Sequence, residues 1–126
     1  MQVKCNQINL QHSRTATDNL MQIIVTENID TTLVQKPYLY QGKIKGVTRK
    51  YRTYSYGDGK RRAAIIIADD TIDALLITQY SDNDTALLEI KGNEKFYAAS
   101  VYMDYNESID ITFKGIEKIH LRKERK

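Results

Sequence analysis

The run Ala63-Ala-Ile-Ile-Ile-Ala68 is the longest uninterrupted apolar stretch in this chain of 126 residues. A helix that spans a membrane needs about 20 apolar residues, so this short run predicts a strand and no insertion into a membrane. Because every position is apolar, the run is typical of a strand that is buried on both faces. The sequence therefore predicts a sheet with cover on both sides.

Three further strand signals follow the apolar run at hairpin spacing. They cover residues 73–80, 85–91 and 95–103, and short stretches rich in Asp, Asn, Ser and Gly separate them. Turn residues at this spacing favour antiparallel neighbours. We therefore expect residues 63–103 to form an antiparallel meander.

The residues before the run predict a strand, a helix and a second strand. Partial alternation over 3–10 indicates a short strand, and Thr15-Ala-Thr-Asp18 has the spacing of a helix capping box, which predicts a helix over 15–28. The β-branched stretch 31–35 predicts the second strand, which Pro37 ends. This order is typical of a crossover unit.

The rest of the chain shows weaker signals. Residues 38–62 contain several glycines and no sustained period, which predicts a loop-rich region with one short strand at 51–56. A polar helix is expected over 108–120, ahead of a basic tail at 117–126.

The composition predicts one globular domain of the α/β (α+β) class. Hydrophobic residues make up 41% and charged residues 28%, which is close to the average of folded proteins. The predicted elements give one mainly antiparallel sheet with flanking helices. Such an arrangement leaves one apolar sheet face uncovered, which is rare in monomers. We therefore expect a missing partner layer.

The N-terminal residues predict an intracellular location. The first seven residues contain no apolar segment that resembles a secretion signal, so a nuclear or cytoplasmic protein is expected. Cys5 is the single cysteine, which excludes an internal disulfide and a cysteine-rich zinc site.

Charge is distributed unevenly along the chain. The net charge is only +3, but residues 43–62 carry eight basic residues and one acidic residue, interleaved with Tyr51, Tyr54 and Tyr56. Basic and aromatic side chains in this pattern favour phosphate contacts and base stacking, although a solvated loop without a ligand explains the charge equally well. The candidate nucleic-acid-binding residues are Arg49, Lys50, Arg52, Lys60, Arg61 and Arg62.

Five fragments occur in an order and spacing that is similar to one known family, the endonuclease domain of non-LTR retrotransposons. The resemblance covers nearly the whole chain and places it in the exonuclease/endonuclease/phosphatase superfamily. The fragments are Gln7-Ile-Asn-Leu-Gln-His-Ser13, Leu33-Val-Gln-Lys-Pro37, Gly42-Lys-Ile-Lys-Gly46, Arg62-Ala-Ala-Ile-Ile-Ile67 and Ala99-Ser-Val-Tyr102.

The resemblance implies an αββα sandwich and magnesium-dependent nicking of DNA, which primes reverse transcription on the target. It also implies that residues 1–126 form a single partial domain, the N-terminal half of the sandwich. The later family motifs, an Asp-x-Asn that follows a glycine and a terminal Asp-His pair, do not occur in the chain. The second half would supply them together with the opposing sheet.

The resemblance assigns roles to three positions. Asn9 matches a family asparagine near the metal and the scissile phosphate, and Tyr102 matches a tyrosine that donates to the phosphate, so both are candidate catalytic residues. A turn residue and a packing tyrosine are the alternatives. Lys36 stands where the family has the glutamate that binds the metal. A lysine repels a cation by roughly 4 kcal/mol per unit charge at 4 Å, so we expect no bound magnesium.

These observations lead to two functional hypotheses. The first is a truncated, degenerate retrotransposon endonuclease that retains weak DNA binding through residues 43–62 and no hydrolysis; whether the chain is an enzyme stays open. The alternative is a non-catalytic nucleic-acid or protein binding module that dimerises, or aggregates, through its exposed sheet face. A third and weaker idea is that Lys36 replaces the charge of magnesium and holds a phosphate. His12 is expected to be structural.

Overall fold

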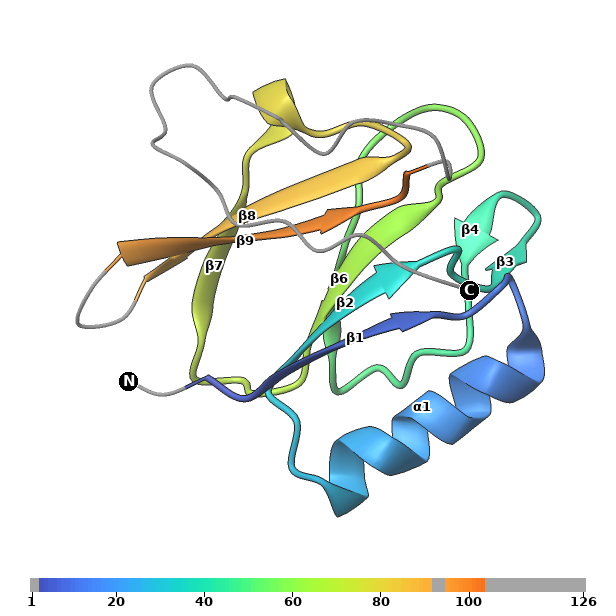
Figure 1. Ribbon diagram of the computed structural model, residues 1–126, viewed down its shortest axis with the longest axis horizontal. Helices are drawn as coiled ribbons and strands as arrows, with labels where there is room; N and C mark the ends of the chain where they lie inside the picture. The colour runs from blue at the N-terminus through green and yellow to red at the C-terminus, as the bar shows by residue number, and fades with distance from the viewer. Residues whose placement is uncertain (1–2, 92–94, 104–126) are drawn as a thin grey trace.

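The structure is a computed structural model, and it describes residues 3–91 and 95–103 (Figure 1). The helix predicted over 108–120 and the basic tail lie outside the described residues. In chain order the elements are β1 (Cys5–Asn9), α1 (Arg14–Thr26), β2 (Thr31–Gln35), β3 (Leu39–Tyr40), β4 (Lys43–Ile44), β5 (Arg52–Tyr54), β6 (Ala63–Ile67), β7 (Asp73–Leu76), a 3₁₀ turn (Thr78–Tyr80), β8 (Thr85–Lys91) and β9 (Lys95–Val101).

The predicted strand–helix–strand unit is confirmed. β1 pairs with β2 in parallel, and α1 makes the connection between them. The helix begins after Ser13, whose hydroxyl accepts a hydrogen bond from the backbone N–H of Ala16 at 3.1 Å. The expected capping box at Thr15 was therefore placed two residues too late, and Ser13 provides the cap, a contribution of about 1 kcal/mol.

The strands form three sheets, so the prediction of one mainly antiparallel sheet was wrong. The first sheet has the order β1-β2-β6-β5, the second is the small β3-β4 hairpin, and the third has the order β7-β8-β9. β6 pairs with β2 and β5 and not with β7, so the expected four-strand meander is limited to three strands.

A tight turn explains why the meander breaks after β6. The carboxylate of Asp69 accepts hydrogen bonds from the backbone N–H of Thr71 at 2.9 Å and from its hydroxyl at 2.7 Å. Ile72 follows and is buried in the core between the sheets. The turn therefore directs the chain out of the first sheet and into the third.

The two large sheets pack on each other, and α1 covers the other side of the first sheet. Ala64 and Ile66 of β6 face the helix in one apolar cluster, whereas Ile65 and Ile67 face β8 of the third sheet in another. The prediction that β6 is buried on both faces is confirmed. The partner layer that was expected to be missing is present, because β7, β8 and β9 supply it.

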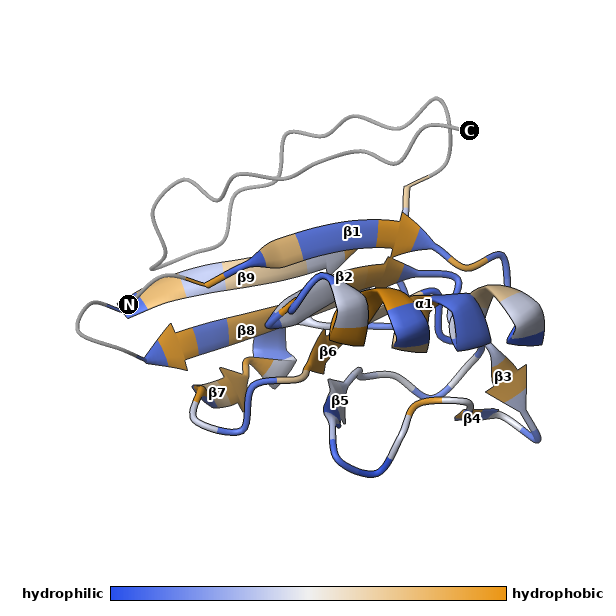
Figure 2. Cartoon of the chain, turned by 90° about the horizontal axis from the view of Figure 1, so that it is seen from below, coloured by the Kyte–Doolittle hydropathy of each residue, from blue (hydrophilic) through white to orange (hydrophobic). Residues whose placement is uncertain are grey.

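The amphipathic patterns agree with these layers. Figure 2 shows both hydrophobic and hydrophilic residues on α1 and on β8. Leu20 and Ile24 of α1 are buried against the first sheet, while Val25 is 72% exposed. Each fully buried leucine or isoleucine contributes about 1.5–3 kcal/mol, so both interfaces stabilise the fold.

Within residues 3–91 and 95–103, no helix has the length and apolar character that crossing a membrane requires.

Candidate phosphate-binding site

Several of the predicted site residues meet at one edge of the two packed sheets. β1 and β2 are parallel and both end there, with Asn9 opposite Gln35. β6 runs antiparallel to β2 and therefore begins there, with Ala63 opposite Gln35. β9 also ends there. We call the group at this edge the cationic edge; it consists of His12, Lys36, Lys60, Arg62 and Tyr102.

Lys36 turns away from the strand that precedes it. Its φ of 47° lies in the left-handed region, which a side chain with a Cβ disfavours. Two backbone hydrogen bonds of 2.8 Å hold this conformation: Lys36 donates to the carbonyl of Arg62, and its own carbonyl accepts from His12. A non-glycine residue kept in this conformation is typical of functional sites.

Two cations lie against the ring of Tyr102. The Nζ of Lys36 is 5.2 Å from the ring centroid, and the guanidinium carbon of Arg62 is 4.5 Å from it. Cations at such distances interact with the negative face of the ring by about 0.5–1 kcal/mol at exposed sites. The predicted tyrosine is thus placed beside the predicted lysine, although they are distant in sequence.

Asp84 fixes the orientation of Arg62. Its two carboxylate oxygens accept from Nε and Nη2 of Arg62, both at 2.7 Å, and its carbonyl accepts from the backbone N–H of Tyr102 at 2.8 Å. Since both side chains remain more than a third exposed, this ion pair contributes little stability. Its effect is geometric, because a bidentate contact fixes the plane of the guanidinium.

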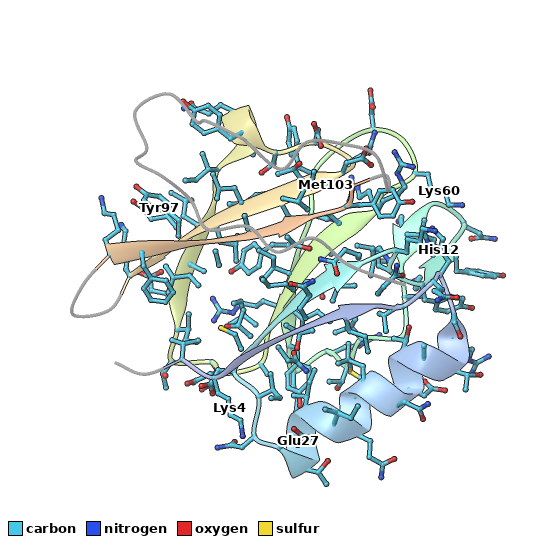
Figure 3. All side chains as sticks on the ribbon, in the orientation of Figure 1. Lys4, His12, Glu27, Lys60, Tyr97 and Met103 are labelled. Atoms are coloured by element: carbon cyan, nitrogen blue, oxygen red, sulfur yellow. The ribbon has the colours of Figure 1, made fainter. Side chains whose placement is uncertain are left out.

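His12 completes the cationic edge. Its Nδ1 lies 2.6 Å from the carbonyl oxygen of Pro37, which only accepts, so Nδ1 carries the hydrogen and Nε2 is the acceptor in the neutral ring. Burial lowers the pKa of His12, the bond to Pro37 opposes this shift, and the positive charges of Lys60, Lys36 and Arg62 lower the pKa further. Figure 3 shows His12 and Lys60 on the same side of the molecule.

The donors at this edge do not fit a magnesium ion. Mg²⁺ takes oxygen ligands, mainly carboxylates and water, whereas the edge presents ammonium and guanidinium groups. The carboxylate of Asp84 is already engaged by Arg62. Across the described part of the chain, no three acidic, histidine or cysteine side chains gather closely enough to hold a metal.

Asn9 has a local structural role. Its side-chain oxygen accepts a hydrogen bond from the backbone N–H of Gln11 at 2.8 Å. Gln11 and His12 then both adopt positive φ values, of 51° and 56°, in the turn that leads to the helix cap. Such bonds are typical of asparagine in turns. The contact with a phosphate that the family resemblance implied stays a prediction.

The predicted basic segment does not form one surface. Lys60 and Arg62 lie just before β6, at the cationic edge, whereas Arg49 and Lys50 lie just before β5. β5 and β6 are antiparallel, so these two pairs flank opposite ends of the sheet. A five-residue strand separates them by roughly 15 Å.

Two of the predicted nucleic-acid-binding arginines make internal contacts. The guanidinium of Arg52 donates to the carbonyls of Ile72 at 2.5 Å and of Asp69 at 3.2 Å. Arg61 donates to the hydroxyl of Ser55 at 3.0 Å and to the carbonyl of Gly57 at 2.6 Å. These contacts hold loops in place, and a role of either arginine in binding nucleic acid stays untested.

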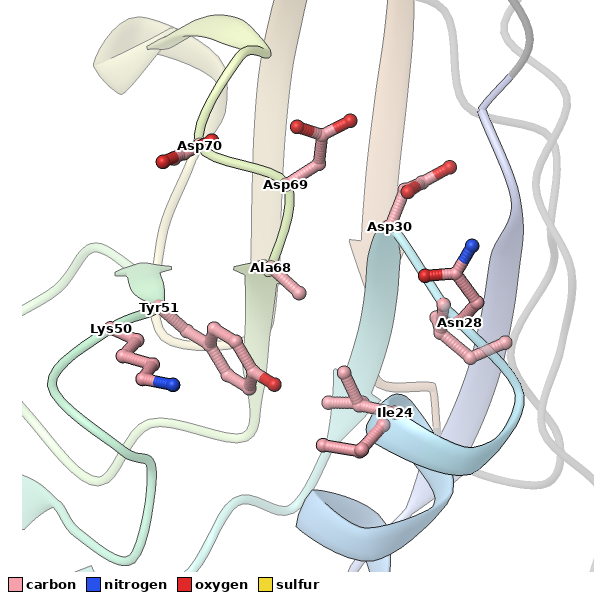
Figure 4. A pocket seen from close by; sticks show the side chains of 10 residues that line it. Ile24, Asn28, Asp30, Lys50, Tyr51, Ala68, Asp69 and Asp70 are labelled. Atoms are coloured by element: carbon pink, nitrogen blue, oxygen red, sulfur yellow. The ribbon is translucent and has the colours of Figure 1, made fainter.

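The opposite end of the first sheet has a different character. An open cavity of about 780 Å³ lies between the end of α1 and the turn after β6. Figure 4 shows Asp30, Asp69 and Asp70 around it, with Lys50 and Tyr51 on one side. Its three carboxylates disfavour phosphate. The two ends of the sheet are thus distinct in charge.

Sequence reasoning missed two groups of residues at the cationic edge. Asp84 was interpreted only as a turn residue, and the buried pair Gln35 and Ser100 was not considered. Ser100 is 65 residues from Gln35. No local pattern indicates a contact over such a separation, so only the family resemblance brought Lys36 and Tyr102 together.

Two sheets packed face to face, with a helix outside one of them, form a fold that is similar to that of a retrotransposon endonuclease domain. One solved structure with a similar fold is the endonuclease domain of TRAS1, a telomere-specific non-LTR retrotransposon, with a TM-score of 0.70 and 24% sequence identity. The match covers 84% of this chain and 47% of that one, so this chain spans about half of its length. The predicted α+β class and the similarity to an endonuclease-domain fold are confirmed, but the opposing sheet that was expected from a second half is supplied by β7, β8 and β9.

Two other comparisons found nothing: no protein-family model matches the chain, and neither does any curated protein.

Proposed function

We propose that this chain is a non-LTR retrotransposon endonuclease domain that binds the phosphate backbone of DNA at its cationic edge and does not hydrolyse it. The observation that carries the proposal is the convergence of Lys36 and Arg62 on the ring of Tyr102. Within the family resemblance, Lys36 replaces the carboxylate that holds the metal. A fixed positive charge then lies where the family has a bound cation.

The individual side chains have separable roles in this proposal. Lys36 and the exposed Lys60 supply ammonium donors for phosphate oxygens. Arg62, with its plane fixed by Asp84, supplies a directed guanidinium. The ring of Tyr102 restrains both cations near one point, and its hydroxyl is a further donor.

The proposal excludes hydrolysis on the basis of the donor set. Magnesium-dependent cleavage needs carboxylates that hold the ion and a base that activates water. At this edge the carboxylate of Asp84 is bound to Arg62, and a lysine stands where the resemblance implies the metal ligand. The chain therefore retains the electrostatic part of DNA recognition and lacks the chemical part.

The binding test compares two double variants with equal loss of charge. Lys36→Gln with Lys60→Gln removes two charges from the cationic edge, and Arg49→Gln with Lys50→Gln removes two from the other end. We expect the edge variant to weaken binding to a labelled duplex about tenfold and to reduce the salt slope by about 1–2, with little change for the control. Equal effects, or no effect, contradict the proposal.

The cleavage test uses supercoiled plasmid in magnesium. We expect no nicking by the chain or by its Lys36→Glu variant, because one new carboxylate among cations does not make a metal site. Magnesium-dependent nicking that persists through repurification and disappears in the edge double variant would refute the non-catalytic proposal.

A further inference from the structure

Two buried polar side chains join the packed sheets beside the cationic edge. The amide nitrogen of Gln35, in β2, donates to the hydroxyl of Ser100, in β9, at 3.0 Å. The hydroxyl of Ser100 in turn donates to the carbonyl of Val34 at 2.7 Å. Gln35 is 1% exposed and Ser100 is fully buried, so water does not compete for these bonds.

The position of this pair in the sequence matters. Gln35 immediately precedes Lys36, and Ser100 stands two residues before Tyr102. The hydrogen bonds therefore join the end of the strand that carries the cation to the end of the strand that carries the ring. The remaining bonds at this point, from Lys36 to Arg62 and from Tyr102 to Asp84, extend the same connection.

Packing alone does not account for a polar pair here. The surrounding intersheet cluster is apolar and includes Ile65, Ile67 and Leu88. A buried amide is costly where its hydrogen bonds are incomplete, and the side-chain oxygen of Gln35 has no partner within the described chain. Apolar side chains would stabilise the interface as well, but hydrogen bonds fix one relative position of the strands.

We infer that Gln35 and Ser100 are positioning residues for the cationic edge, because they set Lys36 against the ring of Tyr102. This inference rests on the proposed function. The left-handed conformation of Lys36 makes the position sensitive, since small movements of Gln35 are transmitted directly to a strained neighbour.

The test is a double-mutant cycle on duplex binding. Ser100→Ala removes both hydrogen bonds, and we expect it to weaken binding about tenfold and to reduce the salt slope by about one. In a Lys36→Gln background we expect Ser100→Ala to cause no further loss, because the two residues act as one unit. Gln35→Met, a change of similar shape without the amide donor, should repeat this result.

A matched control separates positioning from stability. Thr17 is buried, and its hydroxyl donates to the carbonyl of Ser13 at 2.7 Å, a bond at the start of α1 that joins neither β2 nor β9. Thr17→Val removes a comparable bond, and we expect it to lower the unfolding temperature without changing DNA affinity.

The possible results distinguish the positioning role of Gln35 and Ser100 from DNA binding at the cationic edge. If wild type binds, the edge double variant binds weakly, and Ser100→Ala binds like Thr17→Val, only the positioning role is wrong. Additive effects of Lys36→Gln and Ser100→Ala also overturn it. If wild type does not bind the duplex, the proposed function fails, and the positioning role fails with it.

Discussion

Lys36 occupies a backbone conformation that glycine adopts without strain. Its φ of 47° costs about 1–2 kcal/mol for a residue with a Cβ. The cation–π interaction between the Lys36 ammonium group and the ring of Tyr102 offsets part of this cost. The conformation and the charge at position 36 therefore have separate effects, which substitutions can distinguish.

We predict that Lys36→Gly and Lys36→Ala lose DNA affinity equally, because both lack the ammonium group. Lys36→Gly should be more stable than Lys36→Ala by about 1 kcal/mol, since alanine retains the strain. Urea denaturation and duplex titration measure the two properties. Equal stabilities, or unequal affinities, would show that the backbone conformation is not the cause.

We predict that DNA binding strengthens as the pH falls from 7 toward the lowered pKa of His12. In the free protein, burial and three neighbouring cations lower the pKa of His12, so the ring is neutral near pH 7. A bound phosphate favours the protonated ring. Measurements of duplex affinity from pH 8 to 5 check this prediction, and His12→Gln should abolish the pH dependence. An unchanged pH profile in that variant would exclude His12 as the group that titrates.

The same residue makes an opposite contribution to stability. Because folding lowers the pKa of His12, the unfolded chain takes up the proton first as the pH falls below 6.5. The contribution of the neutral ring is complete above that pH and is lost as the pH falls through the folded-state pKa.

At the scale of elements, β6 determines the architecture because it is apolar on both faces. That property was readable from the sequence, since no position of the run Ala63–Ile67 is polar. The sequence did not show which element covers each face. α1 covers one face and β8 the other, and the Asp69 turn decides this by taking the chain out of the first sheet.

We predict that Leu88→Ala destabilises the fold by about 2–5 kcal/mol, because Leu88 is fully buried between the sheets. Leu75→Ala is the matched control on the same sheet, where the side chain is 57% exposed, and should cost about 0.5 kcal/mol. Chemical denaturation measures both changes. Similar small losses would mean that the two sheets do not share a core.

At the scale of the whole molecule, the packing of the two sheets makes self-association through the first sheet unfavourable. The alternative of dimerisation was based on an apolar sheet face without cover, and β7, β8 and β9 cover that face. We therefore predict a monomer at micromolar concentration, measured by gel filtration with light scattering. A discrete dimer would restore the alternative of a protein-binding module.

The fold was more predictable than the site because it depends on local patterns. Periodicity located nearly all the strands and the helix, and the one serious error, a single sheet, concerned long-range pairing. At the site, the proximity of Lys36 and Tyr102 required the family resemblance. The basic residues of segment 43–62 lie at opposite ends of the sheet because β5 and β6 are antiparallel. A count of charges along the sequence does not reveal this pairing.

The positive charges of the cationic edge have a consequence for sequence change at position 36. A single nucleotide change converts a lysine codon into a glutamate codon, so position 36 is one mutation from the family residue. However, a carboxylate at position 36 would form ion pairs with Lys60 and Arg62, which leaves it unavailable to a magnesium ion. A Lys36→Glu change therefore adds an ion pair to the edge and no metal ligand. On the proposed function, one substitution at this position does not supply cleavage.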